Sequence, residues 1–295
     1  MTLGNTTTRT AALTGLLAFL AAGGAAAAPL PVVVSILPQQ EFVRAVGGDE
    51  VTVDVLVGPG HSPATYEPTP RQVAGLSAAR LFFAAGVPFE RGIVPRIAAM
   101  PDGPVIAGAR DFGPAAARGH DDHGHDHDHG DGPDPHTWLD PVQAMAFADT
   151  VCARLTAARP AAAAEFAARR DSLRARLATL DREIAAELAP WRGRAFFVFH
   201  PAYGHFARRY GLEQVAVEQD GHDPGARQVA AVVARARAAG ATVIVVQPQF
   251  SRRTAEAIAR EVGAEILVLD PLAADYETSL RHIAAALAAS FASAR

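Results

Sequence analysis

The sequence contains a single cysteine, Cys152, among its 295 residues. One thiol cannot form an intramolecular disulfide, even in an oxidising compartment, and it cannot build a metal site from several thiolates. We expect Cys152 to be buried in a helix. Any metal site in this chain must therefore depend on other side chains.

Lysine is absent, so all 27 basic residues are arginines, and the formal net charge is −4 with a pI of about 6.3. No stretch of the sequence forms a basic stripe, which excludes a nucleic-acid partner. The sequence also lacks the H-E-x-x-H and G-x-S-x-G patterns of common hydrolases. Hydrophobic residues nevertheless make up 49% of the chain, enough to bury a substantial core.

Long hydrophobic runs are missing except at the N-terminus. There, Arg9 precedes the apolar stretch AALTGLLAFLAAGGAAAA, which ends in small residues. This pattern predicts a signal peptide over residues 1–28, with cleavage near Ala27 or Ala28, and hence an exported, periplasmic protein. A retained N-terminal anchor is the alternative.

After this segment, short β-branched runs alternate with amphipathic stretches rich in Ala and Leu. The alternation predicts an α/β fold with parallel sheets in two lobes, over residues 29–159 and 191–295. Between the lobes, we predict one linking helix over residues 160–190, which would limit hinge motion. Its apolar side chains recur at spacings of seven, four, three, four and four, as a helical stripe requires: Phe166, Leu173, Leu177, Leu180, Ile184 and Leu188.

Four side chains follow predicted strands or loops, two in each lobe. His200 ends the run FFVFH and Asp270 ends ILVLD, while His61 follows VTVDVLV after a Gly-Pro-Gly turn and His136 precedes a helix that begins near Pro141. Ligands of open α/β sheets bind outside the carboxyl ends of the strands. We therefore predict that His61, His136, His200 and Asp270 meet in the interlobe cleft. Three imidazoles and one carboxylate suit tetrahedral Zn²⁺.

Other polar residues are weaker candidates. His205 is predicted to lie on a helix facing away from the site, either at the surface or hydrogen-bonded to a ligand, while His222 is expected in a turn and His282 on the solvated face of the last helix. Three further residues are candidates for orienting the ligands through hydrogen bonds: Glu67, Tyr203 and Glu218.

The segment GHDDHGHDHDHG, residues 119–130, holds five histidines and four aspartates. Its composition predicts an exposed loop that offers ligands to a metal. Because ordering a flexible loop costs entropy, we expect these imidazoles to form an accessory site, weaker than the cleft. A solvated loop without a metal role is the alternative. The accessory residues are His120, His123, His125, His127 and His129.

With these residues identified, the chain resembles the ZnuA-like zinc and manganese solute-binding proteins of bacterial ABC transporters. The matching segments are VSILPQQEFVRAVGGD, YEPTPRQV, DPHTWLDP, FHPAYGHFARRYGL and QPQFSRRTAEAIAREVGAEILVLDPL. In that family the first ligand usually follows a Pro shortly before YEP, where this chain has Ala64. The resemblance to an AztC-like subgroup implies that His61 takes its place.

The resemblance implies a protein that is not an enzyme. Such a protein captures Zn²⁺ and delivers it to an ABC permease, with a periplasmic zinc metallochaperone as a further partner, and we expect a monomer. The alternatives are a secreted zinc hydrolase, or a metal-buffering protein or adhesin with the same fold. Because imidazole binds metal only when neutral, affinity is expected to fall as pH drops through the histidine range near about 6.5.

Overall fold

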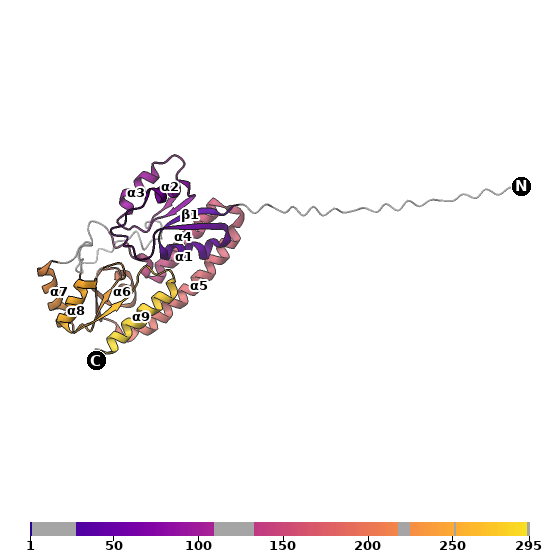
Figure 1. Cartoon of the computed structure of the whole chain (residues 1–295). Coiled ribbons are helices and arrows are strands. Elements are labelled where there is room, and N and C mark those ends of the chain that lie inside the picture. Colours follow the sequence, from indigo (N-terminus) through magenta and orange to yellow (C-terminus); the bar gives the residue numbers. More distant parts are fainter. Residues whose placement is uncertain (2–27, 109–132, 218–224, 251, 294–295) are drawn as a thin grey trace.

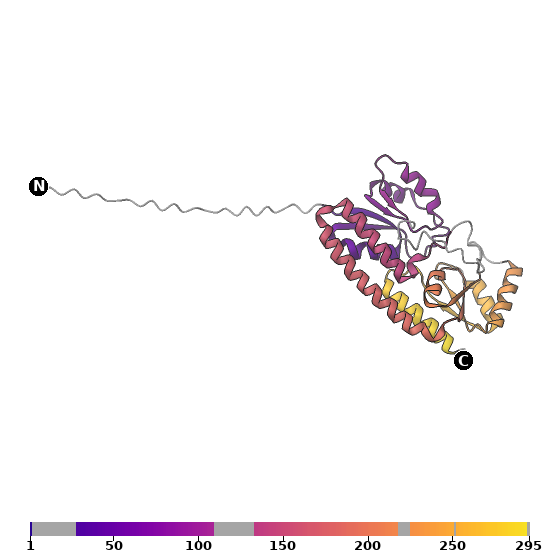
Figure 2. The same ribbon diagram turned by 180° about the vertical axis from the view of Figure 1, so that it is seen from behind.

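The computed structural model describes residues 28–108, 133–217, 225–250 and 252–293, together with Met1 (Figure 1). These residues form two α/β lobes (Figures 1 and 2). Most of the predicted signal peptide and the whole His-rich segment 119–130 lie outside the described residues. Among the described residues, no helix is both long and apolar enough to cross a membrane.

The first lobe is built on a parallel sheet with the strand order β2-β1-β3-β4. The central strand β1 is rich in Val, and its last five residues are buried, as expected for a strand covered on both faces. Three helices accompany the sheet. The elements are β1 (Leu30–Ile36), α1 (Leu37–Gly47), β2 (Val51–Val57), α2 (Pro70–Ala78), β3 (Leu81–Phe83), α3 (Glu90–Ala98) and β4 (Val105–Ala107).

The second lobe repeats this arrangement with the order β6-β5-β7-β8, again entirely parallel. The predicted α/β class with two parallel-sheet lobes is therefore confirmed. The elements are β5 (Ala195–Val198), α6 (Gly204–Tyr210), β6 (Glu213–Ala216), α7 (Ala226–Ala238), β7 (Val243–Val246), α8 (Arg252–Val262), β8 (Glu265–Val268) and α9 (Tyr276–Ser293).

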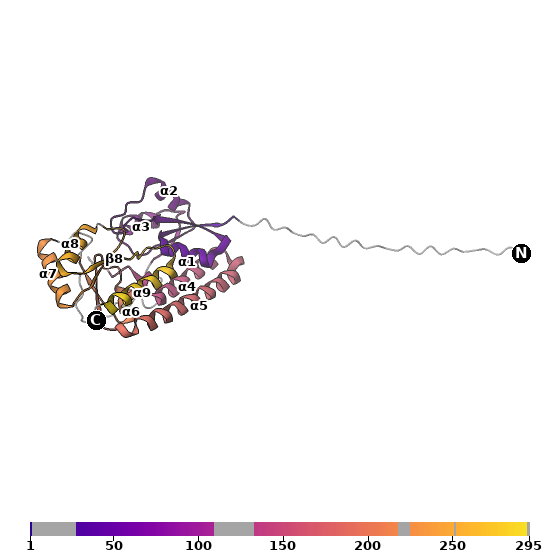
Figure 3. The same ribbon diagram turned by 60° about the horizontal axis from the view of Figure 1, so that its bottom comes forward.

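Two α-helices of the described residues lie between β4 and β5 in the chain, α4 (Pro141–Ala158) and the long α5 (Ala163–Leu188), and α5 falls within residues 160–190, where one linking helix is predicted. Helix α4 begins where the sequence predicts, because Pro141 is suited to a first turn and the Asp140 side chain accepts a hydrogen bond from the backbone N–H of Val142 at 2.9 Å. Cys152 is buried in this helix. In α5 all six residues of the predicted apolar stripe are buried. Figure 3 shows α5 alongside both α4 and α9.

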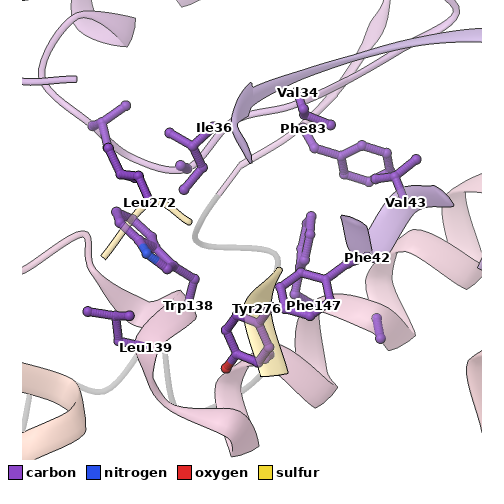
Figure 4. Close-up of a cluster of buried hydrophobic side chains, with 14 of the residues drawn as sticks. Val34, Ile36, Phe42, Val43, Phe83, Trp138, Leu139, Phe147, Leu272 and Tyr276 are labelled. Carbon is purple, nitrogen blue, oxygen red and sulfur yellow. The ribbon is translucent and has the colours of Figure 1, made fainter. Parts of the chain in front are cut away.

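A shared hydrophobic core joins the lobes near the start of α9. Tyr276, the first residue of α9, packs edge to face on Phe42 of α1 with ring centroids 4.8 Å apart, and Phe42 contacts Phe147 of α4 at 5.9 Å (Figure 4). Trp138 lies in the same cluster and donates from Nε1 to the carbonyl of Pro271 at 2.8 Å. Side chains from the end of the chain therefore help to build the core of the first lobe.

Candidate metal centre

Two predicted ligands from different lobes meet in the structure. His200 lies two residues beyond the end of β5, and His136 immediately precedes the 3₁₀ helix Thr137–Leu139. Their Nε2 atoms are 3.3 Å apart, and the ring centroids are 5.2 Å apart. For this contact to be a hydrogen bond, one nitrogen must carry a proton and the other must accept it.

The separation of these nitrogens matches that of two ligands on one zinc ion. Two nitrogens that each lie about 2.0–2.1 Å from a tetrahedral Zn²⁺ are about 3.3–3.4 Å apart. The Nε2 atoms of His136 and His200 already stand at 3.3 Å. The distance between these two nitrogens is therefore compatible with both of them binding one zinc ion.

Residues that follow β7 hold His200 in place. The Gln247 side chain accepts from the backbone N–H of His200 at 3.2 Å and donates to its carbonyl at 2.6 Å. Gln247 is itself fully buried, so both contacts are shielded from water. The ring of Phe250 stacks on the imidazole with centroids 4.8 Å apart at 24°. The backbone and the ring plane of His200 are thus both fixed.

Asp270 lies two residues beyond β8 and is held by two donors. Its Oδ1 accepts from Gln249 Nε2 at 2.8 Å and from the backbone N–H of Leu272 at 2.9 Å. Tyr203 donates its hydroxyl proton to the carbonyl of Leu269 at 3.0 Å, which supports the backbone just before Asp270. Burial, and the nearby charge of Asp270, raise the pKa of the Tyr203 hydroxyl, so this group remains a hydrogen-bond donor.

His136 is held by Asp134, which lies two residues earlier in the chain. Its Oδ1 accepts from the backbone N–H of His136 at 3.0 Å and contacts ring Nδ1 at 2.7 Å. Burial alone would raise the pKa of the Asp134 carboxyl, but the hydrogen bond and the charges of His136 and His205 outweigh burial and lower that pKa well below its usual range. Asp134 therefore acts as an ionised acceptor.

The structure does not bring the full predicted set together. His61 is exposed on the loop after β2, where it contacts Tyr66 edge to face at 5.9 Å. Among the described residues, no group of three or more His, Cys, Asp or Glu side chains is close enough to share one metal ion. His136 and His200 form a pair, and the assignment of His61, His136, His200 and Asp270 as metal ligands stays a prediction.

The remaining polar candidates differ in whether they lie near the His136–His200 pair. His282 is exposed on α9 and Glu67 is exposed before α2, as expected of solvated residues. The prediction that His205 faces away from the site is wrong: His205 is half-buried, and its Nε2 lies 3.0 Å from the carbonyl of Asp134, the residue that contacts His136. Glu218 and His222 lie outside the described residues, as do the five accessory histidines.

Sequence reasoning missed several residues of this centre, namely Asp134, Gln247, Gln249 and Phe250. Two signals were present in the sequence. Asp134 stands two residues before His136, the spacing of an Asx turn, and the segment QPQF directly follows the strand residues TVIVV. The partners of these side chains could not be read from either signal.

Comparison with known proteins identifies a family and solved structures that share this architecture. The family described as zinc-uptake complex component A, periplasmic (ZnuA), matches residues 32–290. A solved ZnuA structure superposes with a TM-score of 0.77 at 32% identity, covering 89% of this chain and 99% of that one. The periplasmic zinc-binding protein TroA of Treponema pallidum has a TM-score of 0.80 at 20% identity, covering 89% of this chain and 99% of that one, and this likeness shows the fold alone.

A curated relative adds a sequence match. The zinc-binding lipoprotein AdcA of Streptococcus pneumoniae is 28% identical over 256 residues, covering 82% of this chain and 50% of that protein. This chain spans about half the length of the curated relatives that it matches first. Since the family match covers most of the sequence, the chain belongs to the ZnuA family of solute-binding proteins.

Proposed function

We propose that this protein binds Zn²⁺ outside the cytoplasmic membrane and delivers it to the permease of an ABC transporter. The zinc ligands in this proposal are His136 and His200, joined by Asp270 and by His61 from its loop. The ion is cargo, captured and released without covalent chemistry. The periplasmic description of the family supports export, and its zinc-uptake description supports the choice of metal.

One observation carries the proposal more than any other. The Nε2 atoms of His136 and His200, from different lobes, are separated by 3.3 Å, the spacing that tetrahedral zinc requires. Two imidazoles alone do not complete a zinc shell, so Asp270 and His61 must approach when the metal binds. In this proposal His61 approaches the pair on its exposed loop.

A secreted zinc hydrolase is the weaker alternative. Such an enzyme needs an open coordination position and a general base within reach of the bound water. The ZnuA family consists of solute-binding proteins, which favours transport over catalysis. A metal-buffering protein or an adhesin with the same fold would lack a permease partner, and an uptake assay separates it from a transport protein.

The first experiment measures zinc stoichiometry and affinity by competition with a chelator. Wild-type protein is compared with His136→Ala, His200→Ala, Asp270→Ala and His61→Ala. We expect one tight Zn²⁺ per wild-type chain and a large loss of affinity in the first two variants. His282→Ala is the matched control, because His282 is exposed on α9. Wild-type affinity in both His136→Ala and His200→Ala would refute the site.

A second experiment separates the cleft from the His-rich segment. Deleting residues 119–130 removes five imidazoles, and we expect one tight zinc to remain while weaker binding disappears. Loss of the tight ion in this deletion would place the principal site in the His-rich segment and contradict the proposal.

A further inference from the structure

Asp134 makes two contacts with one residue through a single oxygen. Its Oδ1 receives the backbone N–H of His136 at 3.0 Å and lies 2.7 Å from ring Nδ1. Because Oδ1 is the common acceptor of both contacts, ring Nδ1 carries the proton in the second one. In the neutral ring the lone pair then belongs to Nε2, which is the atom that faces His200 Nε2 at 3.3 Å.

The support for Asp134 comes from α6 in the other lobe. The backbone carbonyl of Asp134 lies 3.0 Å from His205 Nε2, which must donate because a carbonyl only accepts. His205 Nδ1 is then the acceptor, and it has donors from Gln143 Nε2 at 2.8 Å and Arg208 Nη2 at 3.1 Å. His205 therefore serves as a bridge between α4, α6 and Asp134.

Gly204 allows the carboxylate to approach this helix closely. A Cβ atom at position 204 would lie 2.6 Å from Asp134 Oδ2, well inside van der Waals contact. Arg208 Nη2 lies 3.8 Å from the same oxygen and adds a positive charge on this side. Any larger side chain at position 204 would force the carboxylate away from its place.

We propose that Asp134, seated on α6 by Gly204 and His205, is a positioning residue that presents His136 Nε2 to the metal. This inference rests on the zinc site proposed above. It adds that the tautomer of a ligand from one lobe is set by a carboxylate that the other lobe holds in place. The proton on Nδ1 selects the metal-binding nitrogen, and the backbone contact fixes the direction of the ring.

The expected size of the effect follows from other metal sites. Removing a side chain that orients a histidine ligand lowers metal affinity by about 10- to 100-fold. Without Asp134, the His136 ring can carry its proton on Nε2, which blocks binding through that atom. The predicted signature is therefore a change of tautomer together with a loss of affinity.

The test uses the full chain in three variants, Asp134→Ala, Asp134→Asn and Gly204→Ala. Nitrogen-15 NMR of the zinc-free protein near about pH 8, where histidines are neutral, reports the tautomer of His136. The His136 signals are assigned with His136→Gln. Zinc affinity is measured on the same samples by chelator competition. Asp149→Ala is the matched control, because Asp149 pairs with Arg170 and Arg174 between α4 and α5.

We expect His136 in the wild type to carry its proton on Nδ1. Asp134→Ala should mix the tautomers and weaken zinc binding by about 10- to 100-fold. Asp134→Asn keeps an oxygen that can accept both N–H groups, so it should retain the tautomer and recover most of the affinity. Gly204→Ala should resemble Asp134→Ala in milder form, whereas Asp149→Ala should match the wild type in both measurements.

Two outcomes would overturn the inference. One is an Asp134→Ala protein with wild-type affinity and an unchanged tautomer; the other is an equal loss in Asp134→Ala and Asp134→Asn with no change of tautomer in either. If Asp134→Ala fails to fold, the contrast between Asp134→Asn and Gly204→Ala decides. A wild-type protein without one tight zinc would refute the proposed function instead, while the tautomer in zinc-free protein would still test Asp134.

Discussion

The two lobes share one strand order but relate differently to the hydrophobic core. In the first lobe, neighbouring residues of β1 such as Val33 and Val34 belong to the same core, which includes α4, α5 and α9. In the second lobe the faces of β5 separate. Phe196 and Val198 join the shared core, whereas Phe197 joins a second cluster with α7 and α8. The inner face of the second lobe therefore packs in the shared core, and its outer face packs in a separate cluster.

This difference bears on the metal centre. His136 directly precedes the 3₁₀ helix whose Trp138 and Leu139 lie in the shared core. His200 follows β5, whose inner face lies in the same core. The positions of His136 and His200 thus both depend on the shared core. Damage to the shared core should disturb the pair, and damage to the outer cluster should spare it.

The largest expected effect is on the shared core. Phe42→Ala removes a buried ring that contacts both Phe147 and Tyr276, and we expect it to lower the free energy of unfolding by about 3–5 kcal/mol. Chemical denaturation measures the loss. A cost below about 1 kcal/mol would show that the lobes do not depend on this contact.

The outer cluster should respond locally. Ile258 of α8 is fully buried in that cluster, and Ile258→Ala should cost about 2–4 kcal/mol, because burial is lost and a cavity remains. Hydrogen exchange should quicken in β6, β7 and β8 but not in β1 or β2. Equal acceleration in both sheets would show that the two clusters unfold as one unit and would remove the distinction drawn between the lobes.

One hydrogen bond connects the segment that carries His136 with the segment that carries Asp270: it runs from Trp138 Nε1 to the carbonyl of Pro271. Trp138→Phe keeps most of the apolar ring but leaves the Pro271 carbonyl without its Nε1 donor, at an expected cost of about 1–3 kcal/mol. Thermal unfolding measures this cost. An unfolding temperature equal to that of the wild type would contradict the importance of the Trp138 bond.

The smallest effect concerns pH. Glu41 of α1 accepts from the backbone N–H of Tyr276 at 2.7 Å. Burial, and to a lesser extent Asp275 and Glu277, raise its pKa, although the bond from Tyr276 opposes the shift. Since the folded state holds the proton more tightly than the unfolded state, this group's contribution is fully present at low pH and falls as pH rises through the raised pKa.

Glu41→Gln should remove that fall. The stability of the variant relative to wild type should increase from acid toward neutral pH, by less than about 1 kcal/mol because the group is only half-buried. Denaturation across this pH range measures the difference. The exposed Glu187→Gln controls for the substitution. A relative stability of Glu41→Gln that falls with rising pH would reverse the assigned sign.

Local pattern sufficed to predict some features of the site. The runs FFVFH and ILVLD place His200 and Asp270 just beyond strand ends, because a buried parallel strand reads as a continuous apolar run. The location of His61 was less determined. It follows a Gly-Pro-Gly turn, and a loop of this kind has no periodicity that fixes where its side chains point. Gln247 and Asp134 were missed because the sequence does not show which residues their side chains contact.

The sequence by itself determined the order of strands and helices, the long helix with its six buried residues, and the positions of His200 and Asp270 just beyond strand ends. These features follow from periodicity and local backbone chemistry, which act over a few residues. Only the tertiary structure decided which of the predicted ligands form the close pair, His136 and His200, that Asp134 rests against Gly204, and that Tyr276 packs on Phe42. Such contacts join residues far apart in the chain, and they depend on how whole elements pack.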